Sequence, residues 1–448
     1  MKNAIASGSA RVRMPSWKSL MACASAAALA ASLSGCGSGP AAQGAASTSI
    51  PPVSQEDLPR LPKGEDQLSW NVEQKIIGHR NMNVIFASDL VKAGGHPYPL
   101  PRGRDLGDFS YAYAGATRSV GEYFDRTHVT GLLVIKDGRI VFERYAKGYQ
   151  ERNDGSSRSM AKTFAGVLVG LAVKDGYIRS VDDPVSKYLP ELTGTMYEKV
   201  SIRQMMQMTS GVPYREDPND PTSDLYPLQA CLFKHQKGCL AAFVKDLGSR
   251  PNASPKPPGT TFSYSTADAV LIGILLERAT GRHDADYLSD RIWKPFGMEQ
   301  DGYWNVETEG GNTFGGSGFG ATLRDYGRFG MYLMHQGVLP DGTRTLPDGW
   351  MSDALTPTAA SLTARKPYGY FLWLPQANGG SGMVDPSAPP MRGGSRTFYA
   401  LGSSGQNIVV NPAENVVIVK WAAWGPPMKS GADSEDFAVY SAIVDRLH

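Results

Sequence analysis

Two runs rich in β-branched and aromatic residues flank an Asp-Gly pair within residues 129–148. The first run contains Leu132 and Val134, and the second contains Ile140 and Phe142. An Asp-Gly pair between two such runs is typical of a tight turn joining antiparallel strands. The pattern therefore predicts a β-hairpin here.

The spacing of apolar residues changes from Ser159 onward. Phe164, Val167, Leu168 and Leu171 recur at helical intervals, and the pattern stops at the next Asp-Gly pair. Apolar positions three and four residues apart form one face of an amphipathic helix. We therefore expect a helix that begins near Ser159.

Later segments continue the same change from strands to helices and back to strands. They predict helices over 200–210 and 265–281, a glycine-rich stretch at 310–320, a helix with Tyr326, Phe329 and Leu333, strands Phe398–Val410 and Val416–Trp421, and a helix over Glu435–Leu447. Strands thus lie at both ends of the domain, and helices fill its middle. Antiparallel hairpins with segregated helices indicate an α+β fold and not a doubly wound sheet.

Residues 1–35 have the features of an export signal. Four cations and no acid precede a short apolar run, which is too short to span a bilayer comfortably. The end of this run, Leu33 to Cys36, resembles a bacterial lipoprotein signal. The resemblance implies cleavage before Cys36 and lipidation of its thiol, and Gly37 favours the outer membrane, facing the periplasm. A plain secretory signal with an incidental cysteine is the alternative.

Residues 36–65 are rich in Ala, Gly, Ser and Pro, a composition that is typical of a flexible linker. We expect this linker to tether a domain spanning 66–448 to the membrane through the lipid.

The overall composition excludes disorder and nucleic-acid binding. The 448 residues are 20% charged and 10% aromatic, which is ordinary for a folded protein. The formal net charge of +2 becomes −2 when the four cations of residues 1–35 are removed. No clustered basic stretch remains, and nucleic-acid recognition would need one.

The cysteines fit an oxidising compartment. Cys23 lies in the signal and Cys36 at the predicted lipidation site, which leaves Cys231 and Cys239 on either side of a short polar loop. Two remaining thiols in such a compartment are expected to pair. Two free, half-buried thiols are the alternative, and neither cysteine has a catalytic or metal-binding partner nearby.

The first candidate for chemistry is the pair Ser159 and Lys162. Three residues apart on a helix, their side chains lean toward one face. A serine hydroxyl becomes a good nucleophile when a base removes its proton, and an amine can be that base when its pKa is lowered. Alone, this motif is weak, because a chain of this length contains about one by chance.

The second candidate is Tyr264, which follows a Pro-Pro-Gly turn and precedes a predicted helix with Thr266 at its start. A tyrosine there can lie beside the serine–lysine pair and pass a proton to a leaving group. A half-buried core tyrosine is the alternative.

The third candidate is the run Ser403, Ser404 and Gly405 before Gln406, at the entrance to a strand. Small residues on a strand allow a ligand to approach the backbone closely. A backbone N–H there could complete an oxyanion hole with the N–H of Ser159. A strand edge built of small residues is the alternative.

Together the three candidates resemble the penicillin-recognising serine hydrolases: class C β-lactamases, D-alanyl-D-alanine peptidases, related esterases and 6-aminohexanoate-dimer hydrolases. Their order along the chain is the same, and the resemblance covers roughly residues 105–447. Matching phrases connect them, namely Val181–Val185, Tyr188–Pro190, Met208–Val212, Pro258-Gly259 and Tyr368–Tyr370 with Trp373. The phrases Ser159–Lys162 and Gly211–Asp224 are most similar to the 6-aminohexanoate-dimer hydrolase branch.

The resemblance implies a β-lactamase/transpeptidase-like fold, in which helices flank an antiparallel sheet and a helical subdomain lies within about 180–320. It also implies a role for each residue. Ser159 would form the acyl-enzyme, Lys162 would be its base, and Tyr264 would carry protons to the leaving group. The oxyanion hole would consist of the N–H groups of Ser159 and Gln406. Substrate contacts are implied for Thr266, Ser403, Ser404 and Gly405.

Two departures from the family pattern argue against β-lactam hydrolysis and leave acyl transfer intact. The third motif has Ser403 where β-lactamases and D-alanyl peptidases usually have a lysine, and the second motif ends in Thr266 in place of Asn. Arg392 or Arg396 is a candidate for the missing charge. Solvated loop arginines are the simpler interpretation of both.

Other catalytic motifs are absent from the sequence. It has no Gly-x-Ser-x-Gly elbow, no His-Glu-x-x-His zinc motif and no Walker loop, and its seven histidines are scattered. We therefore expect no metal and no organic cofactor. The predicted substrate is a small-molecule amide or ester. The alternatives are a D-alanyl-D-alanine peptidase or β-lactamase, and a binding lipoprotein without catalysis.

Overall fold

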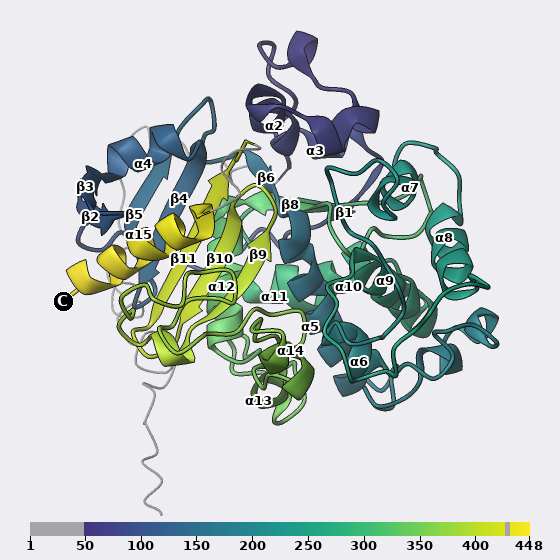
Figure 1. Cartoon of the computed structure of the whole chain (residues 1–448). Coiled ribbons are helices and arrows are strands. Elements are labelled where there is room, and N and C mark those ends of the chain that lie inside the picture. Colours follow the sequence, from purple (N-terminus) through teal and green to yellow (C-terminus); the bar gives the residue numbers. More distant parts are fainter. Residues whose placement is uncertain (1–48, 426–430) are drawn as a thin grey trace, which may run out of the picture.

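Five antiparallel strands form the main sheet of the molecule (Figure 1). The computed structural model describes residues 49–425 and 431–448. In spatial order the strands are β5 (Arg139–Tyr145), β4 (Val129–Lys136), β11 (Val416–Ala422), β10 (Gln406–Asn411) and β9 (Phe398–Gly402). Early and late parts of the chain meet where β4 pairs with β11.

Helices cover both faces of this sheet. Helix α12 (Leu323–Met334) packs against β4, β10 and β11 on one face. On the other face, Asp436 of α15 (Ala432–Arg446) forms a buried ion pair with Lys420 and accepts a hydrogen bond from Asn407. Beside α15 lie helix α4 (Val120–Arg126) and the hairpin β2–β3 (Ser110–Tyr113 and Ala116–Ser119).

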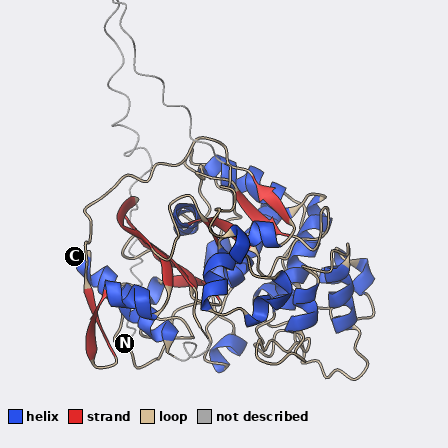
Figure 2. Ribbon diagram, turned by 90° about the horizontal axis from the view of Figure 1, so that it is seen from above, coloured by secondary structure: helices blue, strands red, loops and turns tan. Residues whose placement is uncertain are grey.

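A second region, mostly helical, adjoins the sheet. Seen from above, its helices gather on one side of the molecule (Figure 2). Helices α5 (Ala161–Lys174) and α9 (Thr266–Thr280) pack together at its centre and are buried over most of their length. Around them lie α6 (Ile202–Met206), α7 (Leu225–Ala230), α8 (Cys239–Gly248), α10 (Asp284–Leu288) and α11 (Lys294–Phe296), while α13 (Trp350–Ala354) and α14 (Ala359–Thr363) follow later in the chain.

This region also contains a small antiparallel sheet that the sequence pattern did not predict. Its order is β1 (Ser88–Val91), β7 (Gly302–Asn305), β8 (Phe319–Thr322) and β6 (Asp154–Ser156). The strands are only three or four residues long, and β6, β7 and β8 are buried on both faces. Such strands lack the alternation that marks a half-exposed strand.

Residues 54–65 correct the predicted linker, because they belong to the folded domain. Asp57 is buried and accepts a hydrogen bond of 2.6 Å from Arg80 Nε. The indole N–H of Trp70 donates to the carbonyl of Lys63. This N-terminal segment continues into α2 (Val72–His79) and α3 (Met82–Ile85), which lie above the second region in Figure 1.

The α+β class predicted from the sequence is confirmed, with one difference near the C-terminus. The single strand expected over 398–410 is two strands, β9 and β10, separated by Ser403, Ser404 and Gly405. The predicted signal and the lipidation site at Cys36 lie outside the described residues. In the part of the chain that the structure describes, no helix has the length and apolar character needed to cross a membrane.

Candidate active site

Ser159 and Lys162 lie where the small sheet passes into α5. Strand β6 leads into a short 3-10 turn, Arg158–Met160, and α5 continues from it. Lys162 is therefore in the first turn of α5, and its Nζ lies 3.1 Å from Ser159 Oγ. The structure brings the first candidate pair into direct contact.

The amine of Lys162 is buried among oxygen atoms that carry no formal charge. It contacts Thr266 Oγ1 at 3.0 Å and the carbonyl oxygen of Gly316 at 2.7 Å. The residue is 1% exposed. No carboxylate oxygen among the described residues lies within ion-pair distance of this Nζ.

Burial lowers the pKa of Lys162 to about 8. Nearby Glu216 acts in the opposite direction and favours the ammonium, whereas the positive charge of Arg158 disfavours it. At pH 7 about a tenth of the amine is consequently unprotonated, which makes the neutral form available as a general base.

Glu216 fixes the direction of the hydrogen bonds around the amine. Its carboxylate accepts from the Thr266 N–H (2.8 Å) and from the Thr266 hydroxyl (2.9 Å). With its proton committed to Glu216, Thr266 Oγ1 can only accept from Lys162, and the Gly316 carbonyl can only accept as well. A neutral amine thus uses its two N–H groups there, and its lone pair faces Ser159 Oγ.

Sequence reasoning missed Glu216. The residue lies in Gly211–Asp224, which the sequence analysis used only for its resemblance to one branch of the family. Its partner Thr266 is 50 residues away in sequence, and no local pattern connects the two. Only the fold brings this loop against the start of α9.

Tyr264 lies directly before α9, beside the amine. The Lys162 Nζ is 4.9 Å from the centre of its ring, which stacks on Trp373. Burial raises the pKa of Tyr264, and the charge of Glu216 raises it further, while a hydrogen bond with Ser159 has the opposite effect. The phenol therefore remains protonated at physiological pH and can donate a proton.

The third motif forms the turn between β9 and β10. Ser404 and Gly405 have positive φ angles of 68° and 89°, which close a three-residue loop. Ser403 Oγ accepts a hydrogen bond of 3.2 Å from Arg158 Nε, so this end of the turn lies beside the serine–lysine pair. Gly402 explains the close approach, because a Cβ atom there would be 2.3 Å from the carbonyl oxygen of Ser157.

Gln406 lies farther along this hairpin. It is opposite Gly402 in the register of β9 and β10, and its buried side chain donates to the carbonyl of Ala422. It does not line the cavity that contains Ser159, whereas Ser403 does. The structure therefore does not place Gln406 at the cavity, and Ser403 is the residue of the third motif that lies there. The prediction assumed one continuous strand and did not foresee the tight turn.

A cavity of about 500 Å³ opens over Ser159. The sheet contributes Ser403 to its wall, and the second region contributes Tyr264 and Thr266. Leu68 of the N-terminal segment and Gln229 of α7 close other sides. The side chains of Gln229 and Gln67 are hydrogen-bonded, so α7 and the N-terminal segment meet at this cavity.

Arg392 and Arg396 do not line this cavity. Arg392 pairs with Glu414 at 3.3 Å, and Arg396 borders a separate cavity beside Trp350. Both arginines precede β9, so they lie at the end of the β9–β10 hairpin opposite to the turn at Ser403. Both are exposed, in keeping with the simpler interpretation as solvated loop arginines. The arginines that line the cavity are Arg158 and Arg215.

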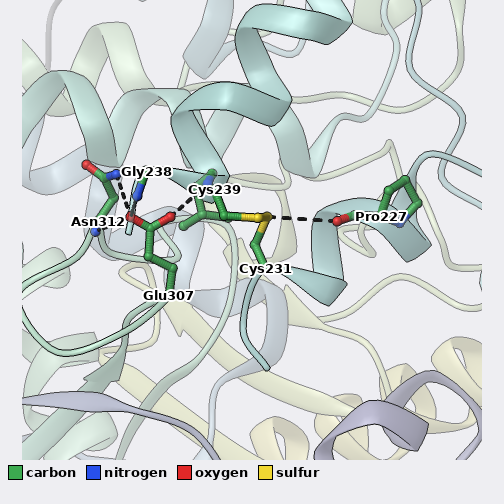
Figure 3. Close-up of a disulfide and its surroundings, with 7 residues drawn as sticks. Pro227, Cys231, Gly238, Cys239, Glu307 and Asn312 are labelled. Carbon is green, nitrogen blue, oxygen red and sulfur yellow. Dashed lines mark hydrogen bonds between the residues drawn. A yellow bond between two sulfur atoms is a disulfide. The ribbon is translucent and has the colours of Figure 1, made fainter. Parts of the chain in front are cut away.

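Cys231 and Cys239 form a disulfide in the structure, with Cα atoms 5.5 Å apart (Figure 3). The bond connects the end of α7 to the start of α8. Next to it, the buried carboxylate of Glu307 accepts hydrogen bonds from the N–H groups of Gly238 and Leu240 at 2.7 Å each. The disulfide thus connects α7, which lines the cavity, to the start of α8, which the Glu307 carboxylate holds.

Within residues 49–425 and 431–448, no group of three histidine, cysteine or acidic side chains could hold a metal ion. His79 is buried near Gln406, and burial holds its pKa well below the ordinary value. The positive charges of Arg158 and Lys75 lower that pKa further. His79 is therefore neutral and lies close to two cations.

Comparison with known proteins places this site in a known fold. The chain is 27% identical over 315 residues to the 6-aminohexanoate-dimer hydrolase of Paenarthrobacter ureafaciens, covering 68% of this chain and 74% of that protein. It is 26% identical over 260 residues to penicillin-binding protein 4 of Amycolatopsis lactamdurans, covering 49% of this chain and 63% of the relative.

Solved structures show the same fold. A Bacillus anthracis protein, provisionally named a 6-aminohexanoate-dimer hydrolase, superposes with a TM-score of 0.71 at 22% identity, covering 88% of this chain and 98% of that one. A class C β-lactamase gives a TM-score of 0.51 at 18% identity, covering 72% and 93%. The Beta-lactamase family model matches residues 117–441, which include the serine–lysine pair, Tyr264 and the β9–β10 turn. The chain therefore belongs to the Beta-lactamase family and is a hydrolase of the β-lactamase fold.

Proposed function

We propose that this protein cleaves an amide or ester bond through an acyl-serine intermediate on Ser159. The observation that carries the proposal is the buried amine of Lys162, 3.1 Å from Ser159 Oγ, with both of its N–H groups engaged elsewhere. An amine held in this way can accept the hydroxyl proton as the serine attacks.

In the first half of the reaction, Ser159 Oγ bonds to the carbonyl carbon and its proton passes to Lys162. The negative charge on the carbonyl oxygen would be stabilised by the backbone N–H groups of Ser159 and Ser403. The bond to the leaving group then breaks, and Tyr264 delivers a proton to the departing nitrogen or oxygen. Lys162 returns the proton that it holds to the phenolate of Tyr264.

In the second half, water attacks the acyl carbon of the ester on Ser159. Lys162 accepts a proton from that water, and the same two N–H groups stabilise the second oxyanion. The bond between the acyl carbon and Ser159 Oγ then breaks, Lys162 passes its proton to this oxygen, and the carboxylic acid leaves. No step requires a metal or an organic cofactor.

Linear amides and esters are the preferred substrate class. A relative that matches 68% of this chain is a 6-aminohexanoate-dimer hydrolase. The third motif lacks the lysine by which β-lactamases and D-alanyl peptidases hold a carboxylate. A D-alanyl-D-alanine peptidase or β-lactamase is the second candidate, supported by the names of other relatives. A binding lipoprotein without turnover is the third.

Hydrolysis of a panel of 4-nitrophenyl esters, 4-nitroanilides and a chromogenic β-lactam tests these alternatives. The wild type should hydrolyse esters or anilides, and Ser159→Ala and Lys162→Met should each lose at least about a hundredfold in kcat/KM. Exposed Lys245→Met in α8 is the control and should retain full activity. Equal rates for the wild type and Ser159→Ala would refute the acyl-serine mechanism, and preferential β-lactam turnover would favour the second candidate.

We also propose that the protein is anchored in the bacterial outer membrane by a lipid on Cys36 and faces the periplasm. The support is the N-terminal sequence, with its four cations, short apolar run and Leu33-Ser34-Gly35-Cys36. Radiolabelled palmitate should enter the full chain in a bacterial host and should be absent from Cys36→Ala. Equal labelling, or none in either protein, would contradict the anchor.

A further inference from the structure

Arg158, the residue before Ser159, is a cation without an acidic partner. Its Nε donates to Ser403 Oγ at 3.2 Å. Among the described residues, no carboxylate oxygen lies within 4 Å of its guanidinium, and no acceptor pairs with its two Nη groups. The side chain is only partly exposed. Because a buried charge without a counter-ion is costly, this guanidinium is suited to receive an anion.

The backbone of Arg158 is unusual for a residue of its size. Its φ angle is +48°, in the left-handed region that residues other than glycine, asparagine and aspartate rarely adopt. The conformation occurs directly before Ser159, and non-glycine residues with such angles cluster at functional sites. Here it accompanies a side chain that lines the cavity over Ser159.

The other charged side chains of this cavity already have partners. Arg215 forms an ion pair with Asp220 and donates to Thr222 Oγ1. Both carboxylate oxygens of Glu216 accept hydrogen bonds from Thr266. Arg158 is thus the charged side chain of this cavity that is left to form an ion pair with a substrate.

A second cavity, of about 300 Å³, adjoins the first and shares Arg158 and Ser403 with it. Lys75 and His79 of α2 line this extension, and His79 is neutral for the reasons given above. The Lys75 ammonium donates to the carbonyl of Trp424 at 2.7 Å. The extension thus has positive charges and no acidic side chain in its lining.

We propose that the cleft accepts an amide or ester that carries a carboxylate near the bond to be cleaved, and that Arg158 and Ser403 bind this carboxylate. The inference rests on the proposed function for the bond that is cleaved. A planar guanidinium with two free Nη groups matches a carboxylate in a bidentate geometry. Arg158, in the short turn directly before α5, would then supply the positive charge that the third motif, Ser403–Gly405, lacks.

Two matched pairs of compounds test the proposal. Hexanoylglycine and hexanoylglycinamide differ by a carboxylate on the leaving side, and glutaric acid mono-4-nitroanilide and butyric acid 4-nitroanilide differ by one on the acyl side. Each pair is compared by calorimetric binding to Ser159→Ala, which requires no turnover, and by kcat/KM with Ser159 intact. For each protein we take the ratio of the carboxylate compound to its neutral partner, in binding constant and in kcat/KM. Any general effect of a substitution on Ser159 or Lys162 changes both compounds alike and cancels in this ratio.

The carboxylate member of at least one pair should bind at least about tenfold more tightly, as expected for a charge-assisted hydrogen bond. Arg158→Asn should abolish this ratio, because asparagine removes the charge and tolerates the left-handed backbone. Arg158→Lys should restore part of it. Arg215→Gln, which removes a paired charge from the same cavity, should keep it.

The inference would be overturned if the carboxylate and neutral members of both pairs bound equally well. It would also be overturned if the preference for the carboxylate persisted in Arg158→Asn, or if Arg215→Gln lost it to the same extent. The binding arm separates this outcome from failure of the proposed function. Arg158-dependent binding of the carboxylate without hydrolysis of any compound would leave the inference standing and refute the proposed hydrolysis.

Discussion

At the scale of single residues, the reactivity of the site depends on opposing influences on one amine. Burial and the charge of Arg158 lower the pKa of Lys162, and Glu216 raises it. The same Glu216 orients Thr266 and thereby leaves the amine lone pair facing Ser159. The balance leaves a base that is partly neutral near physiological pH.

The pH dependence of Ser159 acylation should report this balance. The neutral amine is the active form, so the rate should fall about tenfold per pH unit below 8 and level off above it. Glu216→Gln removes a charge that favours the ammonium, and its profile should move to lower pH. Arg158→Asn removes a charge that disfavours the ammonium, and its profile should move to higher pH.

Stopped-flow acylation by a neutral 4-nitrophenyl ester, from pH 5 to 10, measures these profiles. Circular dichroism over the same range is the control for unfolding. This account of Lys162 would be contradicted if the pH profiles of both variants moved in the same direction. A wild-type acylation rate that does not change with pH would contradict it as well.

At the scale of elements, short and separate segments hold the site. The helix at Ser159 and the tyrosine before α9 were predictable from local patterns of spacing and turn residues. The approach of the last strands to them was predicted from the family resemblance. The split of β9 from β10 was not predicted, because Ser403 and Ser404 carry no strong turn signal and Ser404 adopts a positive φ. Glu216 and Arg158 were missed because their roles depend on contacts between segments distant in sequence.

The disulfide between α7 and α8 should stabilise one wall of the cleft. Replacing both cysteines, Cys231→Ser with Cys239→Ser, removes a bond that closes a short loop, a contribution of about 2 kcal/mol. We expect the melting temperature to fall by several degrees and KM to rise more than kcat falls, because α7 carries Gln229 into the cavity.

Thermal unfolding with and without dithiothreitol checks this expectation. Reductant should lower the melting temperature of the wild type and leave the double variant unchanged. A reductant effect of the same size in both proteins would show that the bond does not contribute.

At the scale of the whole molecule, the cleft lies between parts of the chain that fold from distant segments. The main sheet supplies Ser403, the second region supplies Tyr264 and Thr266, and the N-terminal segment supplies Leu68. The sheet and the second region are in close contact where Gly402 lies against the carbonyl of Ser157. Their spacing there sets the distance from Ser159 to the β9–β10 turn.

Gly402→Ala tests whether that spacing matters. A Cβ atom at this position would lie 2.3 Å from Ser157 O, so the two backbones must separate. Displacement of about 1 Å at a reacting centre can cost on the order of a hundredfold in rate, and we expect a loss of that size. Exposed Gly121→Ala in α4, where the nearest atom is 3.8 Å away, is the matched control. Full activity of Gly402→Ala would show that the contact does not position the turn.

The central claim, that Ser159 is an activated nucleophile, is tested most directly without knowing the substrate. The soluble fragment from Ser49, the first described residue, is incubated with a serine-reactive fluorophosphonate beside Ser159→Ala, and the intact mass of each protein is measured. We predict one covalent adduct on the wild type, mapped to the peptide that contains Ser159, and none on the variant. No adduct on either protein, with both folded, would contradict the claim and leave a binding protein that has this fold without its chemistry.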